Sequence, residues 1–151
     1  MQAQSLKGCN RGEEHSSKIL FLDTKTGRTR AFRSKAPALF DGDISPDGKR
    51  IAYGVQAGND HAIDLYTARL DGKGVRRLTK NGKVNYMPVY SPDGKKIAFV
   101  QGEDEEKRIG FLTLKTGRIK YVDPPGDYVQ IEQWLAMDPG GVGLEAARAG
   151  R

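Results

Sequence analysis

The chain has 151 residues, a length typical of one domain, and its 37% hydrophobic and 8% aromatic residues suffice for a modest core. No window is apolar over the about 18 residues that a membrane-spanning helix needs, and no hydrophobic stretch follows Lys7 or Arg11 as a secretory signal requires. The single cysteine, Cys9, excludes an intrachain disulfide and is interpreted as an exposed thiol, with lipidation as the minor alternative. The net charge of +6 leaves two explanations open, an anionic partner or basic side chains at solvated edges.

The first 17 residues combine Gly, Asn, Ser and charged residues without apolar periodicity, which predicts a flexible arm over 1–17. Residues 18–33 follow with two short apolar runs around Lys25-Thr26-Gly27, a pattern typical of two strands joined by a tight loop. Similar hairpins recur twice downstream, each time after two further strands. We therefore interpret 18–33 as the outer half of a four-stranded unit.

A Ser-Pro-Asp-Gly turn occurs twice, and the two copies start 46 residues apart. The copies are Ser45, Pro46, Asp47 and Gly48, and then Ser91, Pro92, Asp93 and Gly94. Proline pre-sets φ for the turn, glycine accepts a positive φ, and the serine hydroxyl can cap the turn. In the strand that follows the first copy, the large residues Ile51, Tyr53 and Val55 alternate with the small Ala52 and Gly54. This alternation predicts a strand that is covered on both faces.

A period of this size, with two hairpins per unit, predicts stacked four-stranded units such as the blades of a β-propeller. Complete units cover 41–79 and 86–122, with loops at Gln56–His61 and Gly102–Arg108 between their second and third strands. Basic residues recur after the second hairpin loop of each unit, where a blade has its outermost strand. They are Arg28, Arg30, Arg76, Arg77, Arg118 and Lys120. We favour a solvated edge that resists edge-to-edge pairing over nucleic-acid binding, because no aromatic and basic platform accompanies these residues.

Residues 128–135 are predicted to be the innermost strand of the next unit, since Trp134 follows Tyr90 by 44 residues. The Gly- and Ala-rich stretch 136–151 is predicted to be a tail. The chain thus supplies about three blades, fewer than the ~4–8 of a closed propeller. Three explanations stay open: a piece of a longer propeller, an open stack of sheets, or a ring completed by further copies, such as six blades from two chains.

Catalytic constellations are absent from the sequence. No G-x-S-x-G nucleophile elbow occurs, and His15 and His61 have no metal-ligand spacing to each other or to Cys9. We therefore predict a protein that is not an enzyme, without catalytic or cofactor-binding residues.

One near-match to a metal loop lies over residues 41–47, where acidic residues and Ser45 alternate as in a calcium site. An EF-hand loop needs Gly at its sixth position and Glu at its twelfth, but Pro46 and Ala52 stand there. The turn explains Ser45 to Gly48 without an ion, and we predict no metal site.

Aromatic residues offer one candidate binding patch. Tyr86, Tyr90 and Trp134, with His61 in a neighbouring loop, are candidates for contact with a partner. Tyr90 and Trp134 occupy equivalent repeat positions, so we favour the competing interpretation, which is packing between blades.

These motifs together resemble the TolB-type, WD-repeat-like β-propeller repeat over roughly residues 18–135. The matching residues are Leu65, Tyr66, Leu70, Asp71, Gly72, Arg77, Leu78, Thr79, Pro88, Tyr90 and the stretch Ser91 to Lys95. The resemblance implies an all-β fold of four-stranded antiparallel blades that acts as a non-catalytic scaffold for protein–protein interaction.

The same resemblance implies a periplasmic protein that binds envelope partners such as a peptidoglycan-associated lipoprotein. The start of the chain departs from this pattern because it shows no signal peptide, and a cytoplasmic location is the other expectation. Similar repeats occur in the propellers of prolyl-oligopeptidase-type and tricorn-type peptidases. The alternative function is therefore a substrate-gating propeller of such a peptidase, without its catalytic domain.

Overall fold

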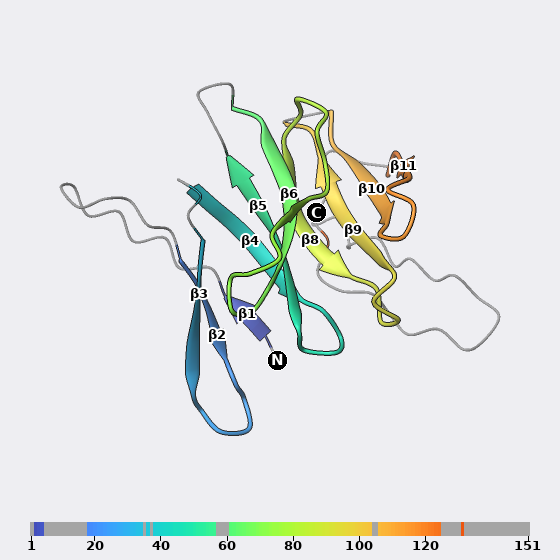
Figure 1. The fold of residues 1–151 in the computed structure, drawn as a ribbon. Coiled ribbons are helices and arrows are strands. Elements are labelled where there is room, and N and C mark those ends of the chain that lie inside the picture. The colour runs from blue at the N-terminus through green and yellow to red at the C-terminus, as the bar shows by residue number, and fades with distance from the viewer. Residues whose placement is uncertain are drawn as a thin grey trace, which may run out of the picture.

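The computed structural model describes residues 2–4, 18–34, 36, 38–56, 61–103, 106–124 and 131, which form eleven strands and no helix (Figure 1). The first sheet contains β1 (Gln2–Gln4), β2 (Lys18–Leu22) and β3 (Thr29–Arg33). The second sheet contains β4 (Ala38–Ile44), β5 (Arg50–Gln56), β6 (Ile63–Arg69) and β7 (Arg76–Arg77). The third sheet contains β8 (Asn85–Tyr90), β9 (Lys96–Gln101), β10 (Arg108–Thr113) and β11 (Ile119–Val122). The prediction of an all-β fold with four-stranded antiparallel units is confirmed.

Each sheet is a meander in which strands that are consecutive in the sequence pair with each other. The second sheet lies between the first and the third (Figure 1). This arrangement places β4 and β8, the first strands of the two complete sheets, in contact. The edge strand opposite β4 is the short, basic β7, and the edge strand opposite β8 is β11. The recurrence of basic residues predicted outermost strands at these positions.

A first hydrophobic core joins the first sheet to the second. Its buried side chains are Ile19, Phe21, Phe32, Leu39, Ile51, Tyr53, Val55 and Ala68. The ring of Phe32 lies 5.0 Å from the ring of Tyr53, centroid to centroid, and is tilted by 57°. Each fully buried side chain of this size contributes about 1.5–3 kcal/mol relative to an exposed one, so this core holds the two sheets together.

A second core joins the second sheet to the third. Its buried side chains are Ala52, Leu65, Tyr90, Ile97, Phe99 and Leu112. Ala52 belongs to this core while Ile51 and Tyr53 belong to the first, and all five residues from 51 to 55 are buried. The prediction that this strand is covered on both faces is therefore confirmed.

A third cluster lies on the far face of the third sheet. Val100 and Ile109 are buried there, and Ile131 packs against them. Ile131 falls within the predicted strand 128–135. The rest of that strand, including Trp134, and the predicted tail 136–151 lie outside the described residues.

The first strands of the two complete sheets carry equivalent irregularities. The register of β4 with β5 shifts between Phe40 and Gly42, and that of β8 with β9 shifts between Tyr86 and Val89. Met87, inside the second shift, has a φ of 52°. Bulges of this kind bend a strand and strengthen its twist, so both sheets bend at the same point of the repeat.

The first sheet differs from expectation in one respect. Gln2–Gln4, which the sequence analysis placed in a flexible arm, form β1 and pair with β2, so that Ala3 lies opposite Phe21. Because β2 corresponds to the third strand of a blade, β1 takes the position of the second strand. The other residues of 1–17 lie outside the described residues.

Candidate functional site: the turn face and its two clefts

The two Ser-Pro-Asp-Gly turns have the same internal hydrogen bonds. The Ser45 hydroxyl donates to Asp47 Oδ1 at 2.6 Å and accepts from the backbone N–H of Arg50 at 2.9 Å. Ser91 makes the same contacts, 2.6 Å to Asp93 and 2.9 Å from the N–H of Lys96. The serine hydroxyl lowers the pKa of Asp47 and of Asp93, because it donates to the ionised carboxylate.

The second hairpin turn of each complete sheet lies beside the first. Leu70 donates its N–H to Lys49 O at 3.3 Å, and Leu114 donates to Lys95 O at 3.0 Å. The Arg50 guanidinium also donates to Gly74 O at 3.1 Å. We call this end of the sheets the turn face, defined in the two complete sheets by residues 45–50, 69–76, 91–96 and 114–118. In Figure 1 the β2–β3, β4–β5 and β8–β9 turns all point to the lower end.

A cleft of about 300 Å³ opens on the turn face between the second and third sheets. Its lining includes both Ser-Pro-Asp-Gly turns, with Arg50, Thr67, Arg76, Tyr90 and Leu114. We call it the narrow cleft. Polar and apolar groups share its lining about equally, and its charged groups are the guanidinium groups of Arg50 and Arg76 and the carboxylates of Asp47 and Asp93.

A second cleft of about 950 Å³ lies between the first and second sheets. It is lined by Phe21, Arg30, Ala31, residues 47–50 and residues 69–71. We call it the wide cleft. Arg30 here and Arg76 in the narrow cleft stand 46 residues apart, so the two clefts are repeat-equivalent. Arg50 lines both of them.

Below the narrow cleft, polar contacts tie the second sheet to the third. Asp43 Oδ2 accepts from the backbone N–H of Tyr90 at 2.7 Å. The Tyr90 hydroxyl lies 3.0 Å from the Thr67 hydroxyl, to which Arg50 Nε donates at 3.2 Å. Burial raises the pKa of Asp43 and that of Tyr90. Both groups thus serve in the contact between sheets.

A second network fastens the outer edge of the second sheet. The Arg77 guanidinium pairs with Asp64 and also donates to Thr79 O at 2.8 Å. The Thr79 hydroxyl donates to Asp64 Oδ1 at 2.9 Å and accepts the N–H of Leu65 at 2.9 Å. Arg77 keeps an exposed side chain on the edge strand, as the solvated-edge interpretation predicted, and its guanidinium also pairs with the carboxylate of the buried Asp64.

A third network occupies the opposite end of the third sheet. Gln101 donates to Asn85 Oδ1 at 2.8 Å and to the Tyr121 hydroxyl at 3.1 Å, and it accepts two bonds from Arg108. The Arg108 guanidinium lies 3.9 Å from the centre of the Tyr121 ring, within cation–π distance. Asn85 also donates to Ile63 O at 2.8 Å, which ties this end to the second sheet.

The candidate aromatic patch is not brought together as one exposed surface. Tyr90 is 6% exposed in the second core, while Tyr86 packs on the third cluster at the far face of the sheet. His61 is exposed before β6 with a φ of 57°, and Trp134 lies outside the described residues. The placement of Tyr90 favours packing between sheets.

The acidic residues of the stretch 41–47 are not brought together into one site either. Asp43 faces Tyr90 of the third sheet, whereas Asp47 lies in the turn with Ser45. Within the described residues, no group of three or more His, Cys, Asp or Glu side chains is placed to hold a metal ion. The turn hydrogen bonds account for this stretch.

Sequence reasoning missed three residues of these hydrogen-bond networks. Thr67, Gln101 and Arg108 carried no motif, and their roles depend on partners 16 to 23 residues away or on the next strand. The one available signal was the change from apolar to polar residues at Asp64 and Thr67 inside an otherwise apolar strand.

The comparisons with known proteins agree with this architecture. No family model matches the chain. It is 40% identical over 63 residues to the Tol-Pal system protein TolB of Anaeromyxobacter dehalogenans, a match that spans 40% of the chain and 14% of that protein. It is 38% identical over 64 residues to dipeptidyl-peptidase 5 of Porphyromonas gingivalis, which spans 40% of the chain and 9% of that protein.

Among solved structures, TolB from Acinetobacter baumannii superposes with a TM-score of 0.60 at 19% identity, over 79% of this chain and 32% of that one. The chain thus matches about a third of the solved protein and less than a sixth of either curated relative. The described sheets are blades of a TolB-like partial β-propeller. In the described residues no helix is long and apolar enough to cross a membrane.

Proposed function

We propose that the chain is a non-catalytic β-propeller scaffold that binds protein partners. The observation that carries this proposal is how the buried polar groups are used. In the described part of the chain, no buried side-chain nitrogen or oxygen lacks a hydrogen-bond partner. Reactive groups of enzymes commonly have perturbed pKa values inside a cleft. Here the raised values belong to Asp43, Tyr53 and Tyr90, which are engaged in packing and hydrogen bonds between neighbouring sheets.

The similarity to TolB, a protein of the Tol-Pal system, supports a scaffold role. We extend this to a partner and a place: an envelope lipoprotein of the peptidoglycan-associated type, bound in the periplasm. The test is biolayer interferometry of the purified chain against the soluble domain of such a lipoprotein from the same organism. We expect saturable binding, and a flat response at every concentration would contradict the partner assignment.

The second candidate function is a substrate-gating propeller of a peptidase. The similarity to dipeptidyl-peptidase 5 favours it. The decisive observation is the coding sequence around these blades. An in-frame hydrolase domain with a G-x-S-x-G elbow would support the gating role. Release of dipeptides by the purified chain alone would contradict both candidates, since neither has a nucleophile in these blades.

We also propose that further blades complete the ring, either from a longer chain or from a second copy. Closed propellers have ~4–8 blades, and three sheets cover only part of a circle. Light scattering on a sizing column distinguishes the two sources for this chain. A particle of twice 16.6 kDa would support six blades from two copies, whereas a particle of 16.6 kDa would assign the other blades to a longer chain.

A further inference from the structure

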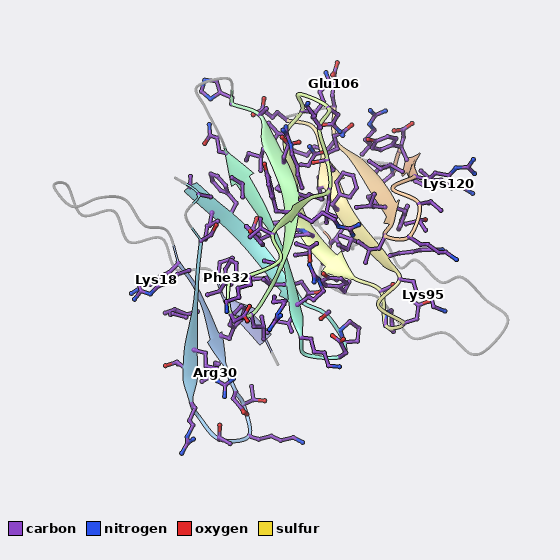
Figure 2. All side chains as sticks on the ribbon, in the orientation of Figure 1. Lys18, Arg30, Phe32, Lys95, Glu106 and Lys120 are labelled. Carbon is purple, nitrogen blue, oxygen red and sulfur yellow. The ribbon has the colours of Figure 1, made fainter. Side chains whose placement is uncertain are left out.

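Charge is unevenly divided between the two ends of the complete sheets. On the turn face, nine basic residues accompany three acidic ones. The basic ones are Lys49, Arg50, Arg69, Lys73, Arg76, Lys95, Lys96, Lys115 and Arg118, and the acidic ones are Asp47, Asp71 and Asp93. At the opposite end, the described residues carry both signs: Lys80, Lys83, Lys107 and Arg108 with Glu103, Glu106 and Asp123. Figure 2 shows Lys95 among the turns and Glu106 at the far end.

The three acidic residues of the turn face are engaged in their own turns. Asp47 and Asp93 accept from their serine hydroxyls and from the N–H groups of Lys49 and Lys95. Asp71 accepts from the N–H of Lys73 and pairs with the exposed Arg69 at 2.8 Å. Since these carboxylates shape the turns, most of the basic side chains face solvent without an ion pair in the described structure.

Two arginines occupy equivalent repeat positions, one in each cleft. Arg30 lines the wide cleft opposite the turn of Asp47, and Arg76 lines the narrow cleft opposite the turn of Asp93. Both side chains are exposed, and neither lies within 4.0 Å of a carboxylate oxygen in the described residues. Guanidinium binds carboxylate through two parallel hydrogen bonds, so each cleft offers a site for one acidic side chain.

We infer that the turn face is the docking surface for the acidic face of a protein partner, with carboxylates seated against Arg30 and Arg76. This inference rests on the proposed scaffold function and assigns the surface that performs it. A basic face steers an acidic partner and fixes its orientation. Both clefts, about 300 and 950 Å³, are large enough to admit a side chain of the partner, and the exposed Val75 beside Arg76 adds an apolar contact.

A protein fits this surface better than a nucleic acid. Single-stranded nucleic acids require aromatic side chains on which bases stack. The turn-face residues include no aromatic side chain, and the two aromatic residues that line the clefts, Phe21 and Tyr90, are 4% and 6% exposed. Their rings belong to the first and second cores and are therefore closed to stacking.

The test compares two double variants of equal net charge. Arg30→Glu with Arg76→Glu reverses the two cleft positions, and Lys80→Glu with Lys83→Glu reverses two exposed lysines at the opposite end. Circular dichroism and thermal melts establish that both are folded. The probe is fluorescein-labelled poly-L-glutamate, followed by anisotropy at low and high salt, with a 20-nucleotide DNA and vesicles of anionic phospholipid as alternative ligands.

We expect poly-L-glutamate to bind the unmodified chain and to bind the cleft variant about tenfold or more weakly, with the control variant within about twofold. Binding should weaken with salt, because exposed charges are screened. Equal weakening in both variants would overturn the inference, since net charge alone would then explain it. Preference for the DNA or the vesicles over poly-L-glutamate would overturn it as well.

The lipoprotein experiment separates this inference from the proposed function. If the lipoprotein binds the cleft and control variants equally, the scaffold stands and the turn-face assignment fails. If poly-L-glutamate behaves as expected while the lipoprotein does not bind, the basic surface stands and the partner assignment fails.

Discussion

The second and third sheets share their first hairpins and differ in their outer halves. Their Ser-Pro-Asp-Gly turns have serine-to-aspartate bonds of the same 2.6 Å. Further out, Asp64 of the second sheet forms a network with Arg77 and Thr79, whereas the register-equivalent residue of the third sheet is Arg108, which donates to Gln101. The third sheet also has Gly110 where the second sheet has Tyr66. A Cβ at Gly110 would overlap the ring of Phe99, so the absence of a side chain there lets the ring lie over the neighbouring strand.

The difference shows which part of the repeat is fixed by backbone geometry and which part is open to variation. The turn needs proline, a short acceptor and a glycine with positive φ, so it recurs unchanged. The outer half needs only a means of holding the fourth strand to the third. The second sheet uses an ion pair for this, and the third uses Phe99, which meets Tyr121 edge-on at 6.4 Å.

The largest expected effect follows substitution of Gly110. Gly110→Ala should lower the free energy of unfolding by roughly 3 kcal/mol, because overpacking beside a buried ring forces side chain or backbone to move. Chemical denaturation measures it. In a Phe99→Leu background the same substitution should cost much less, since the ring is gone. Equal costs in both backgrounds would contradict the proposed clash.

The ion pair of the second sheet should rank next. Asp64→Ala should cost about 1–3 kcal/mol, because it leaves the buried Thr79 hydroxyl and part of the Arg77 guanidinium without their acceptor. The matched control is Arg76→Ala on the same strand, which should change stability by less than about 0.5 kcal/mol because its side chain is exposed. A similar loss of stability in the Asp64 and Arg76 variants would show that charge at the sheet edge, and not the hydrogen-bond network, determines the stability of this edge.

The shared turns should respond alike. Ser45→Ala and Ser91→Ala should each cost about 1 kcal/mol, since each removes a hydroxyl that both donates to an aspartate and accepts a backbone N–H. Urea unfolding of the two single variants provides the comparison. Costs that differ several-fold would show that the surroundings of the turns, rather than the turns themselves, set their contribution.

The smallest effect concerns pH. Burial raises the pKa of Asp43 above the ordinary value of 3.8, so the folded chain retains this proton where the unfolded chain has lost it. The stability from this group is therefore present below 3.8 and is lost as the pH rises through the folded-state pKa. The advantage of the unmodified chain over Asp43→Asn should shrink over that window in denaturant titrations.

Asp93→Asn supplies the control with the opposite sign. The Ser91 hydroxyl lowers the pKa of Asp93, so the stability from this carboxylate is present above 3.8 and is lost as the pH falls through the folded-state pKa. Parallel pH profiles for the Asp43 and Asp93 variants would contradict these assignments.

The sequence predicted the architecture because the architecture depends on local patterns. The alternation from Ile51 to Val55 and the turn at Ser45 involve neighbours in the chain, and a 46-residue period repeats them. The contacts between sheets could not be predicted in this way. Asp43 binds a backbone group 47 residues away, and Arg77 pairs with Asp64 whereas its sequence neighbour Arg76 has no such pair in the described residues. Such partners become neighbours only after the strands pair and the sheets stack.

The meander order of the strands has a consequence for how such chains change in evolution. Every sheet forms from one continuous stretch, and the described contacts between sheets join only those that follow each other in the chain. Duplicating or deleting a stretch of one repeat therefore inserts or removes a whole sheet, and the strand order within the other sheets stays the same. Only the two interfaces flanking the change must adapt, so length variation among relatives can proceed in whole units.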